Sequence, residues 1–420
     1  MTEIMRIAHF TNTYKPDING VARSVTTFRD ALTRLGHQVF VFAQEAPQDY
    51  EETVPYIFRY PGVNIPQFNY SVTMPHSPTV NKMLPSLKLD VIHSNHPIAL
   101  GDVAAKRAKK LNLPLVFTFH TQYIEYADEY TVAYLPFSQA FVEGIIAERL
   151  AKYLNRCQHI ITPSDSIKQN LADYGGLTER VTTIPTGIDL EPYRQADGQA
   201  IRRKYNWDQA RVLVSIGRLA EEKNVKTLLS AVAKVMKQND DVRLLLIGDG
   251  PQRSELEKYT RELGIAEWVK FTGRIPFEEI PAHLKAADIF CFASITETQG
   301  LVTTEALAAG LPVVAVNATG TNDAVTDGVE GLLTENDVEA LAQALNRVLN
   351  DKALLAQLKV ATVKKAESFD MMTQAQKLVA VYKQAIEDKK ANHSIQVDMA
   401  QLKAKLKERR GKTTGMKSNK

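Results

Sequence analysis

The feature that most constrains the fold is a series of short apolar segments, separated by amphipathic stretches, that occurs twice along the chain. Stretches such as 21–36 and 97–112 carry apolar residues at helical spacing between these segments. Apolar strands joined by helices are typical of a parallel, doubly wound sheet, which helices cover on both faces. The sequence therefore predicts an α/β protein with two doubly wound, Rossmann-like domains in series. The expected strands are residues 4–10, 38–43, 89–94, 114–120 and 159–164 in the first series, and 211–218, 242–250, 288–294 and 312–318 in the second.

A segment rich in proline and glycine, IPTGIDLEPYRQADGQ at 184–199, separates the two series. We therefore place the first domain at residues 1–187 and the second at 188–368. An amphipathic helix is expected over 369–387, followed by a basic tail over 388–420. Doubly wound sheets bind ligands beyond the carboxyl ends of their strands, so we expect the site in a cleft between the two domains.

Two positions in the first domain follow predicted strands and suit ligand binding. Gly20 opens a helix after the first strand, where backbone amides and the helix dipole favour an anion. A turn residue is the alternative, and the absence of a G-x-G-x-x-G pattern weakens the case for a dinucleotide coenzyme. His120 ends the strand at 114–120, where an imidazole facing the cleft can donate to or accept from a substrate hydroxyl. A structural role is the alternative for this histidine.

Four tyrosines follow that histidine at spacings of three, four and four residues. On a helix they share one face. Such a face fits packing within the protein, a wall beside the acceptor, or a surface that settles among lipid headgroups. The residues are Tyr123, Tyr126, Tyr130 and Tyr134.

The second domain offers a pair of cations and two glycines after its strands. Arg218 and Lys223 follow the strand that ends at Gly217. A short loop can turn both cations toward one point, which suits a diphosphate because Arg supplies a planar fork and Lys a point charge. Solvated loop charges are the alternative. Gly248 and Gly250 end the next strand, where the backbone can approach a nucleotide closely.

The stretch TETQGLVTTEALAAG, at 296–310, holds two carboxylates around a predicted helix start. Glu297 lies in the loop before the helix, and Glu305 lies about one turn inside it. Carboxylates near a helix N-terminus are favoured by the dipole alone, which is the plain explanation. Ionised carboxylates are also acceptors that grip vicinal hydroxyls, so an anion site flanked by two of them suits a nucleotide sugar. The free N–H groups of that helix start belong to Gly300, Leu301 and Val302.

In this order along the chain, the motifs resemble those of retaining glycosyltransferases of family 4, which have the GT-B fold. The resemblance covers roughly residues 5–386. It implies an enzyme that keeps the anomeric configuration by front-face attack, with the leaving phosphate assisting deprotonation of the acceptor. It implies no metal ion and no cofactor, and the chain contains no Asp-x-Asp motif. The motifs are Gly20, His120, Gly217-Arg218 with Lys223, Gly248-Asp249-Gly250-Pro251, and Glu297-x7-Glu305.

The resemblance also implies a role for each matching position. Gly20 would let a backbone amide approach the donor phosphate, and Arg218 and Lys223 would bind the diphosphate as it leaves. Glu305 would hold the nucleotide ribose, and Glu297 would touch the transferred hexose. The remaining implied contacts are the amides around Gly300, Leu301 and Val302 for the donor's sugar and phosphates, Arg274 and Ile275 for the base, and His120 beside the reacting centre of the sugar.

One position departs from the common family pattern, because Gln299 stands where the family form has Phe. The forms TETQGL and FHTQYIEY are closer to the subgroup that glucosylates diacylglycerol at the membrane surface. The sugar contacted near Gln299 therefore stays open. In the family the last helix crosses back to the first domain, which is the role expected for 369–387.

The charge distribution bears on partners and location. Residues 388–420 hold ten Lys/Arg and three Asp/Glu, whereas the whole chain has a net charge of +3, so the body of the chain is mildly acidic. That body argues against nucleic acid as a partner. Met399, Leu402 and Leu406 align among the basic residues, so the tail is either a tether to an anionic membrane or a solvated end. The low cysteine count of two fits a reducing, cytoplasmic location.

The prediction is a retaining, metal-independent glycosyltransferase that moves glucose from UDP-glucose to diacylglycerol at the cytoplasmic membrane surface. The same chemistry on a soluble or cell-wall acceptor is one alternative, and the donor base and hexose stay open. A non-catalytic protein that binds a nucleotide sugar is another, which the intact His120, Arg218, Lys223 and paired glutamates disfavour. A two-domain dehydrogenase is disfavoured because no G-x-G-x-x-G opens either sheet.

Overall fold

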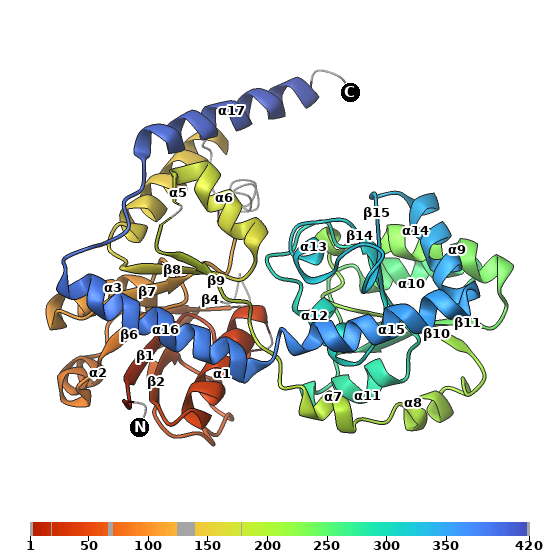
Figure 1. Cartoon of the computed structure of the whole chain (residues 1–420), viewed down its shortest axis with the longest axis horizontal. Helices are drawn as coiled ribbons and strands as arrows, with labels where there is room; N and C mark the ends of the chain where they lie inside the picture. Colours follow the sequence, from red (N-terminus) through yellow and green to blue (C-terminus); the bar gives the residue numbers. More distant parts are fainter. Residues whose placement is uncertain (1–2, 18, 66–69, 124–138, 178, 418–420) are drawn as a thin grey trace. The chain divides into compact units, whose positions relative to one another are not determined.

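The computed structural model describes residues 3–17, 19–65, 70–123, 139–177 and 179–417. The chain divides into two compact units (Figure 1). Unit 1 comprises Met1–Gly187 with Met372–Lys420, and unit 2 comprises Ile188–Met371. Each unit is built around its own parallel sheet, so the predicted α/β class with two Rossmann-like domains is confirmed.

Unit 1 contains a seven-stranded parallel sheet in the order β3-β2-β1-β6-β7-β8-β9. The chain first adds β2 and β3 on one side of β1 and then crosses to β6 on the other side. The strand order therefore reverses between β1 and β6, which is where a doubly wound sheet opens a crevice at its carboxyl edge. The strands are β1 (Arg6–Thr11), β2 (Gln38–Gln44), β3 (Ile57–Tyr60), β6 (Val91–Ser94), β7 (Leu115–Thr118), β8 (His159–Thr162) and β9 (Val181–Thr183), and β4 (Gly62–Ile65) pairs separately with β5 (Tyr70–Thr73).

Several helices of unit 1 begin where a short polar side chain caps them. The Asn19 side chain accepts a hydrogen bond from the Ala22 amide at 2.9 Å, and this starts α1. Ser164 plays the same part for α6, accepting from the amide of Ile167. The helices are α1 (Gly20–Arg34), α2 (Pro78–Met83), α3 (Leu100–Leu111), α5 (Gln139–Leu154), α6 (Asp165–Gly175), α16 (Met371–Lys390) and α17 (Met399–Lys417), with a 3-10 turn η2 (Leu84–Leu87).

Unit 2 contains a six-stranded parallel sheet in the order β12-β11-β10-β13-β14-β15, so its strand order reverses between β10 and β13. Alternate residues of β10 enter different apolar cores, because Leu213 packs with one cluster while Val212 and Val214 pack with another. Burial on both faces explains why these strands are almost continuously apolar. The strands are β10 (Arg211–Ile216), β11 (Val242–Ile247), β12 (Val269–Gly273), β13 (Ile289–Phe292), β14 (Val313–Val316) and β15 (Gly331–Thr334).

Helices pack on both faces of this second sheet. They are α7 (Glu191–Gln195), α8 (Gln199–Lys204), α9 (Val225–Gln238), α10 (Arg253–Glu262), α11 (Ile280–Lys285), α12 (Leu301–Ala308), α13 (Thr321–Ala324), α14 (Val338–Asn350) and α15 (Lys352–Glu367), with 3-10 turns η3 (Glu221–Lys223) and η4 (Phe277–Glu279). Two of these short elements, α7 and the start of α8, lie in the proline- and glycine-rich segment that separates the two predicted strand series.

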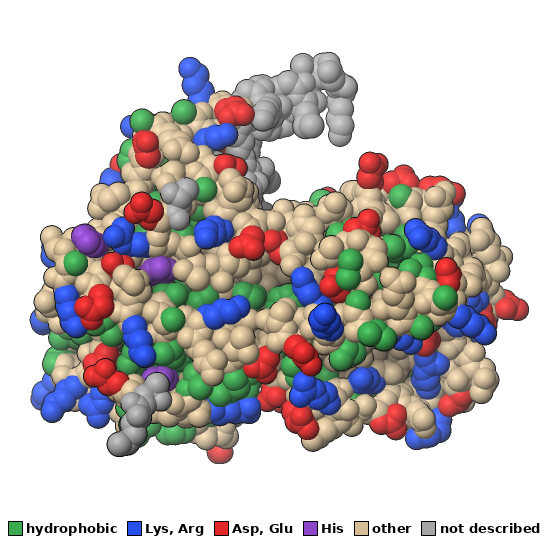
Figure 2. All heavy atoms as spheres, viewed as in Figure 1, with side chains coloured by type: hydrophobic (Ala, Val, Ile, Leu, Met, Phe, Trp, Pro, Cys, Tyr) green, Lys and Arg blue, Asp and Glu red, His purple; other side chains and the backbone are tan. Residues whose placement is uncertain are grey.

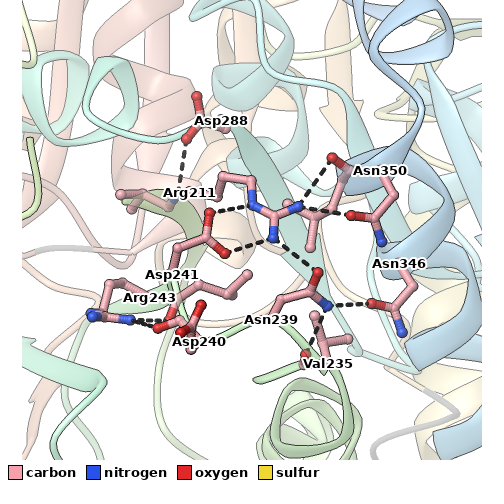
Figure 3. Close-up of polar contacts among 12 residues, drawn as sticks. Arg211, Val235, Asn239, Asp240, Asp241, Arg243, Asp288, Asn346 and Asn350 are labelled. Carbon is pink, nitrogen blue, oxygen red and sulfur yellow. Dashed lines mark hydrogen bonds and ion pairs between the residues drawn. The ribbon is translucent and has the colours of Figure 1, made fainter. Parts of the chain in front are cut away.

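A charged network lies at the amino-terminal ends of the unit 2 strands, on the opposite side of the sheet from their carboxyl ends (Figure 3). The Arg211 guanidinium donates to both carboxylate oxygens of Asp241, at 2.7 and 2.6 Å. The same group reaches Asn239 and Asn350, at 2.9 Å each, and so ties β10 to α14. Arg211 lowers the pKa of Asp241 in return. The network has a structural role, because it stands at the opposite edge from the expected ligand side.

The nine apolar segments predicted as strands all form strands, with bounds that differ by a few residues. The two cysteines, Cys157 and Cys291, are fully buried, and burial raises the pKa of each thiol. On the face drawn in Figure 2, acidic and basic side chains are interspersed, which gives that face no single-sign field for a polyanion. Within the part of the chain that the structure describes, no helix is long and apolar enough to cross a membrane.

The basic tail forms a helix that packs on unit 1. The Asp398 carboxylate caps α17 by accepting from the amides of Ala400 and Gln401, at 2.8 and 3.0 Å. Leu402 and Leu406 are each 5% exposed and pack against alanines of α5. The sequence is compatible with either a membrane tether or a solvated end, and the structure shows that the two leucines of the tail pack within the unit.

Candidate functional site

The loops that follow β10, β11 and β12 are hydrogen-bonded to one another at the carboxyl edge of the unit 2 sheet. The Gly217 amide donates to the Ile247 carbonyl at 3.0 Å, and the Gly248 amide donates to the Gly273 carbonyl at 3.0 Å. These bonds hold three ligand-binding candidates at one edge, since Arg218, Gly248 and Arg274 lie in or beside the bonded positions.

Gly248 is fixed by the crowding of these loops. Its φ is +132°, and a Cβ atom there would lie 2.0 Å from the Gly217 carbonyl oxygen. Any side chain would therefore force the two loops apart. The close approach explains a glycine at this position and keeps the loop of Arg218 against its neighbour.

Lys223 and Glu297 form an ion pair across the point where the strand order reverses. Lys223 follows β10 and Glu297 follows β13, and the Lys223 Nζ to Glu297 Oε1 distance is 2.5 Å. The side chains are 20% and 14% exposed, so both charges are largely withdrawn from water. The structure thus brings together the residue expected to bind the diphosphate and the residue expected to touch the hexose.

The loop of Glu297 is held in place by a glycine that sequence reasoning did not single out. Gly320 has a φ of +80°, and a Cβ atom on it would lie 2.8 Å from the Glu297 Cβ. Gly320 thereby lets α13 approach the loop before α12. The sequence gives no local signal of this contact, since 23 residues separate Gly320 from Glu297.

Helix α12 begins where the sequence predicts. Gly300 is its N-cap residue with a φ of +70°, a conformation that glycine adopts without strain. Neither the Leu301 nor the Val302 amide donates to an acceptor among the described residues. These N–H groups point out of the first turn, where the helix dipole favours an anion.

Glu305 is more deeply placed than its predicted role requires. Its side chain is 1% exposed, and its Oε1 accepts a hydrogen bond from the Tyr193 hydroxyl at 3.0 Å. Tyr193, which sequence reasoning missed, is itself 2% exposed and comes from the segment between the strand series. Tyr193 therefore orients the carboxylate that the resemblance assigns to the ribose.

The remaining candidates of unit 2 differ in how far they are exposed. Arg218 and Arg274 are exposed, and neither side chain forms an ion pair with another described residue. Ile275 is half-buried and packs against the core that also contains β11 residues. Gln299, the position that departs from the family pattern, is 6% exposed.

In unit 1 the predicted residues also follow strands at the carboxyl edge. Gly20 is the exposed first residue of α1, immediately after its Asn19 cap. His120 lies two residues beyond β7 and is half-buried. Tyr123 packs against the unit 1 core, with its ring centroid 5.7 Å from that of Phe119. The candidates Tyr126, Tyr130 and Tyr134 lie outside the described residues.

His120 is oriented by Asn95, which follows β6. The His120 Nε2 to Asn95 Oδ1 distance is 3.0 Å, and the Asn95 Nδ2 donates to the Phe10 carbonyl at 3.3 Å. Because the amide nitrogen is engaged there, the oxygen faces the histidine and accepts from Nε2–H. Burial, with smaller effects of His96 and His9, lowers the pKa of His120 to about 3. The imidazole is therefore neutral near pH 7, with Nδ1 as a hydrogen-bond acceptor.

No group of three or more His, Cys, Asp or Glu residues that could hold a metal ion occurs among the residues the structure describes. The candidate groups are instead one ion pair, two exposed arginines and free helix amides in unit 2, and a neutral histidine in unit 1. Such groups bind anions and hydroxyls. The chemistry that they support is transfer between oxygen atoms of polyols and phosphates.

The sequence matches two known protein-family models. Residues 18–192 match the model Glycosyltransferase Family 4, and residues 197–366 match the model Glycosyl transferases group 1. An alpha-monoglucosyldiacylglycerol synthase of Streptococcus pneumoniae is 34% identical over 340 residues, which is 78% of this chain and 75% of the relative. The chain belongs to glycosyltransferase family 4.

Two further similarities agree with this membership. An alpha-monoglucosyldiacylglycerol synthase of Acholeplasma laidlawii is 30% identical to this glycosyltransferase over 360 residues, covering 83% of this chain and 90% of the relative. The crystal structure of Anabaena Alr3699/HepE in complex with UDP and glucose superposes with a TM-score of 0.73 at 23% identity, covering 90% of this chain and 99% of that one. The predicted family and the GT-B fold are thus confirmed.

Asn95 provides a test of the role that the family resemblance implies for His120. We expect Asn95→Ala to lower kcat about tenfold with little change in donor KM, because the imidazole loses its orienting acceptor. Asn95→Asp should restore most of the rate and move the acidic limb of the pH–rate profile upward, since a carboxylate raises the pKa of a neighbouring imidazole. An unchanged acidic limb in Asn95→Asp would leave Asn95 with a structural role only.

Proposed function

We propose that this glycosyltransferase moves glucose from UDP-glucose to a lipid acceptor, diacylglycerol, with retention of the anomeric configuration and without a metal ion. The observation that carries the donor part is the Lys223–Glu297 pair beside the free amides of α12. The names of the Streptococcus and Acholeplasma relatives support the acceptor part.

The donor groups of UDP-glucose match the chemistry of unit 2. The diphosphate would meet Arg218 and Lys223, with the amides of Leu301 and Val302 adding neutral donors. Glu297 would accept from hexose hydroxyls and Glu305 from those of the ribose. Arg274 with Ile275 would lie beside the base, and Gly20 in unit 1 would admit a phosphate to the start of α1.

The reaction can be written with the residues present. An acceptor hydroxyl attacks the anomeric carbon on the face that the phosphate leaves, the bond from that carbon to the phosphate oxygen breaks, and the hydroxyl proton passes to the leaving phosphate. His120 would accept a hydrogen bond from a sugar hydroxyl through Nδ1. Lys223 and Arg218 would stabilise the negative charge that develops on UDP.

We place the protein at the cytoplasmic face of the membrane, as a peripheral membrane protein. The exposed Lys403 and Lys407 of α17 carry the attraction, and each basic residue near an anionic leaflet contributes about 1 kcal/mol. Since Leu402 and Leu406 are buried, the attachment would be electrostatic and would weaken as salt is raised. Vesicle binding that is insensitive to salt would contradict this part.

A donor-by-acceptor screen tests the proposal. Radiolabelled UDP-glucose, UDP-galactose and GDP-mannose are each offered with vesicles that contain or lack diacylglycerol, in the presence of a chelator. We expect label in a lipid-extractable product only with UDP-glucose and diacylglycerol. Label that appears solely in water-soluble product would refute the lipid acceptor, and a reaction that requires added magnesium would refute the metal-free mechanism. A preference for another donor would point to Gln299, the position that departs from the family pattern.

A further inference from the structure

Unit 1 contains an apolar pocket of about 50 Å³ between α5, α6 and the segment that leads into α17. Its walls are almost wholly hydrocarbon. A water molecule needs two to four polar partners to occupy a cavity, so a pocket with this lining has no stable place for water. The lining includes Phe119, Ala151, Leu154, Ile167, Leu171 and Leu402.

The tail of the chain closes one side of this pocket and is fixed there by polar contacts. The Asn155 side chain accepts from the Val397 amide at 2.8 Å, and the Gly175 carbonyl accepts from the Asp398 amide at 3.0 Å. The Gln401 side chain also donates to the Ala172 carbonyl at 3.1 Å. The tail therefore forms one wall of the pocket and is held there by hydrogen bonds.

The pocket also reaches the segment that carries His120. Phe119 and Tyr123, one residue before and three residues after His120, both line it. At its polar end the Asn170 side chain donates to that of Gln122 at 3.2 Å. The pocket is thus lined in part by sequence neighbours of the histidine predicted to meet the reacting sugar, and its other walls are mostly apolar.

We propose that this pocket binds part of a hydrocarbon chain of the lipid acceptor. The inference rests on the proposed lipid acceptor. It adds a binding site in unit 1 that makes transfer depend on the length of the acyl chain. The volume is that of roughly three or four water-sized groups, so the pocket holds a few methylene groups and not a whole chain. The exposed lysines of α17 stand on the same tail that forms the wall, so the segment that would face an anionic surface also shapes the pocket.

The test is the dependence of transfer on acyl-chain length. Diacylglycerols with chains of 4, 6, 8 and 10 carbons are offered in identical detergent micelles with radiolabelled UDP-glucose. In the wild-type enzyme, kcat/KM should rise about fourfold for each methylene that enters the pocket and then level off. Ala151→Leu, which fills the pocket, should flatten the series, whereas Leu171→Ala should move the plateau to longer chains.

Ala108→Leu is the matched control, because Ala108 is a similarly buried helix alanine of unit 1 that does not line the pocket. It should keep the wild-type series, and a thermal unfolding curve for each variant verifies folding. A flat wild-type series, or equal slopes for Ala151→Leu and Ala108→Leu, would overturn the pocket while leaving the lipid acceptor intact. Absence of product with every diacylglycerol would instead overturn the lipid acceptor, and the pocket proposal with it.

Discussion

Replacing Lys223 by alanine is expected to lower kcat by about 10²–10³-fold, which is the effect typical of removing one group that stabilises a developing anion. In the free enzyme the Lys223 ammonium is paired with Glu297 at 2.5 Å. In the variant Arg218 and Glu297 would remain, and their charges sum to zero. When UDP leaves the glucose, its diphosphate would then meet a site that no longer offers net positive charge.

The carboxylate left behind makes the loss larger than that of a surface lysine. Glu297 is 14% exposed, so its charge is poorly solvated once the ammonium is gone. A second change, Glu297→Gln, made on top of Lys223→Ala, should recover part of the donor affinity, because it removes the uncompensated charge. It should not recover kcat, because neither glutamine nor alanine supplies a cation to the leaving phosphate.

Lys226→Ala is the matched control for this result. Lys226 is also paired with a glutamate at 2.5 Å, namely Glu255, but its side chain is 49% exposed and it lies beyond the loop, in α9. Initial rates measured over a range of UDP-glucose concentrations should be near wild-type for Lys226→Ala. A Lys223→Ala rate within threefold of wild type would remove the diphosphate assignment.

The apolar pattern of the strands was enough to predict the architecture. The central strands of the two main sheets are buried on both faces, as Val212 and Leu213 illustrate by entering opposite cores. Burial of this kind leaves a continuous signal that depends on local sequence alone. The start of α12 at Gly300 was predictable for the same reason, because turn and cap residues act over a few positions.

The partners of the site residues could not be predicted, because they come from distant parts of the chain. Tyr193 reaches Glu305 over 112 residues, and Lys223 reaches Glu297 over 74. Asn95 meets His120 over 25 residues and does so only because β6 and β7 are neighbours in the sheet. A polar residue directly after a predicted strand was the available signal, and it would have marked Asn95.

The tail shows a different limit of sequence reasoning. The spacing of Leu402 and Leu406 indicates an apolar stripe but not what covers it. In the structure the cover is Ala147 and Ala151 of α5, whose small side chains let the helices approach. A stripe of two or three leucines is compatible with a membrane or with a protein surface, and only the tertiary structure distinguishes them.

Acid is expected to unfold unit 1 before unit 2, because the buried histidines of unit 1 resist protonation. His9 and His93 are each 1% exposed, and their ring centroids are 4.6 Å apart. Tyr382 joins them, with its hydroxyl 2.7 Å from His93 Nδ1 and 3.2 Å from His9 Nε2. Burial lowers the pKa of His9 to about 3 and that of His93 well below its ordinary value.

The sign of the effect follows from these directions. In the unfolded chain a histidine titrates near its ordinary pKa of 6.5, so the folded and unfolded states bind equal numbers of protons above that pH. Below it the unfolded chain takes up protons that the folded unit refuses, and stability falls by about 1.4 kcal/mol per pH unit for each histidine. For His9 and His93 together, the loss is about 2.7 kcal/mol per pH unit between pH 6 and pH 4.

Unit 2 supplies an internal reference for this measurement. It contains both tryptophans, Trp207 and Trp268, and a single histidine, His283. Tryptophan fluorescence therefore follows unit 2, whereas far-UV circular dichroism follows both units. In a pH titration from 7.5 to 3.5 the dichroism should fall at a higher pH than the fluorescence changes.

Two substitutions assign the effect to the buried pair. Urea unfolding followed by dichroism at pH 7, 6 and 5 should show that His9→Gln reduces the slope of stability against pH by about 1.4 kcal/mol per unit, whatever it does to stability at pH 7. His393→Gln is the control, because His393 is 56% exposed and stands outside the pair. A slope that His9→Gln leaves as it was would mean that other groups bind the protons. Coincident dichroism and fluorescence transitions would mean that unit 1 does not lead the acid unfolding.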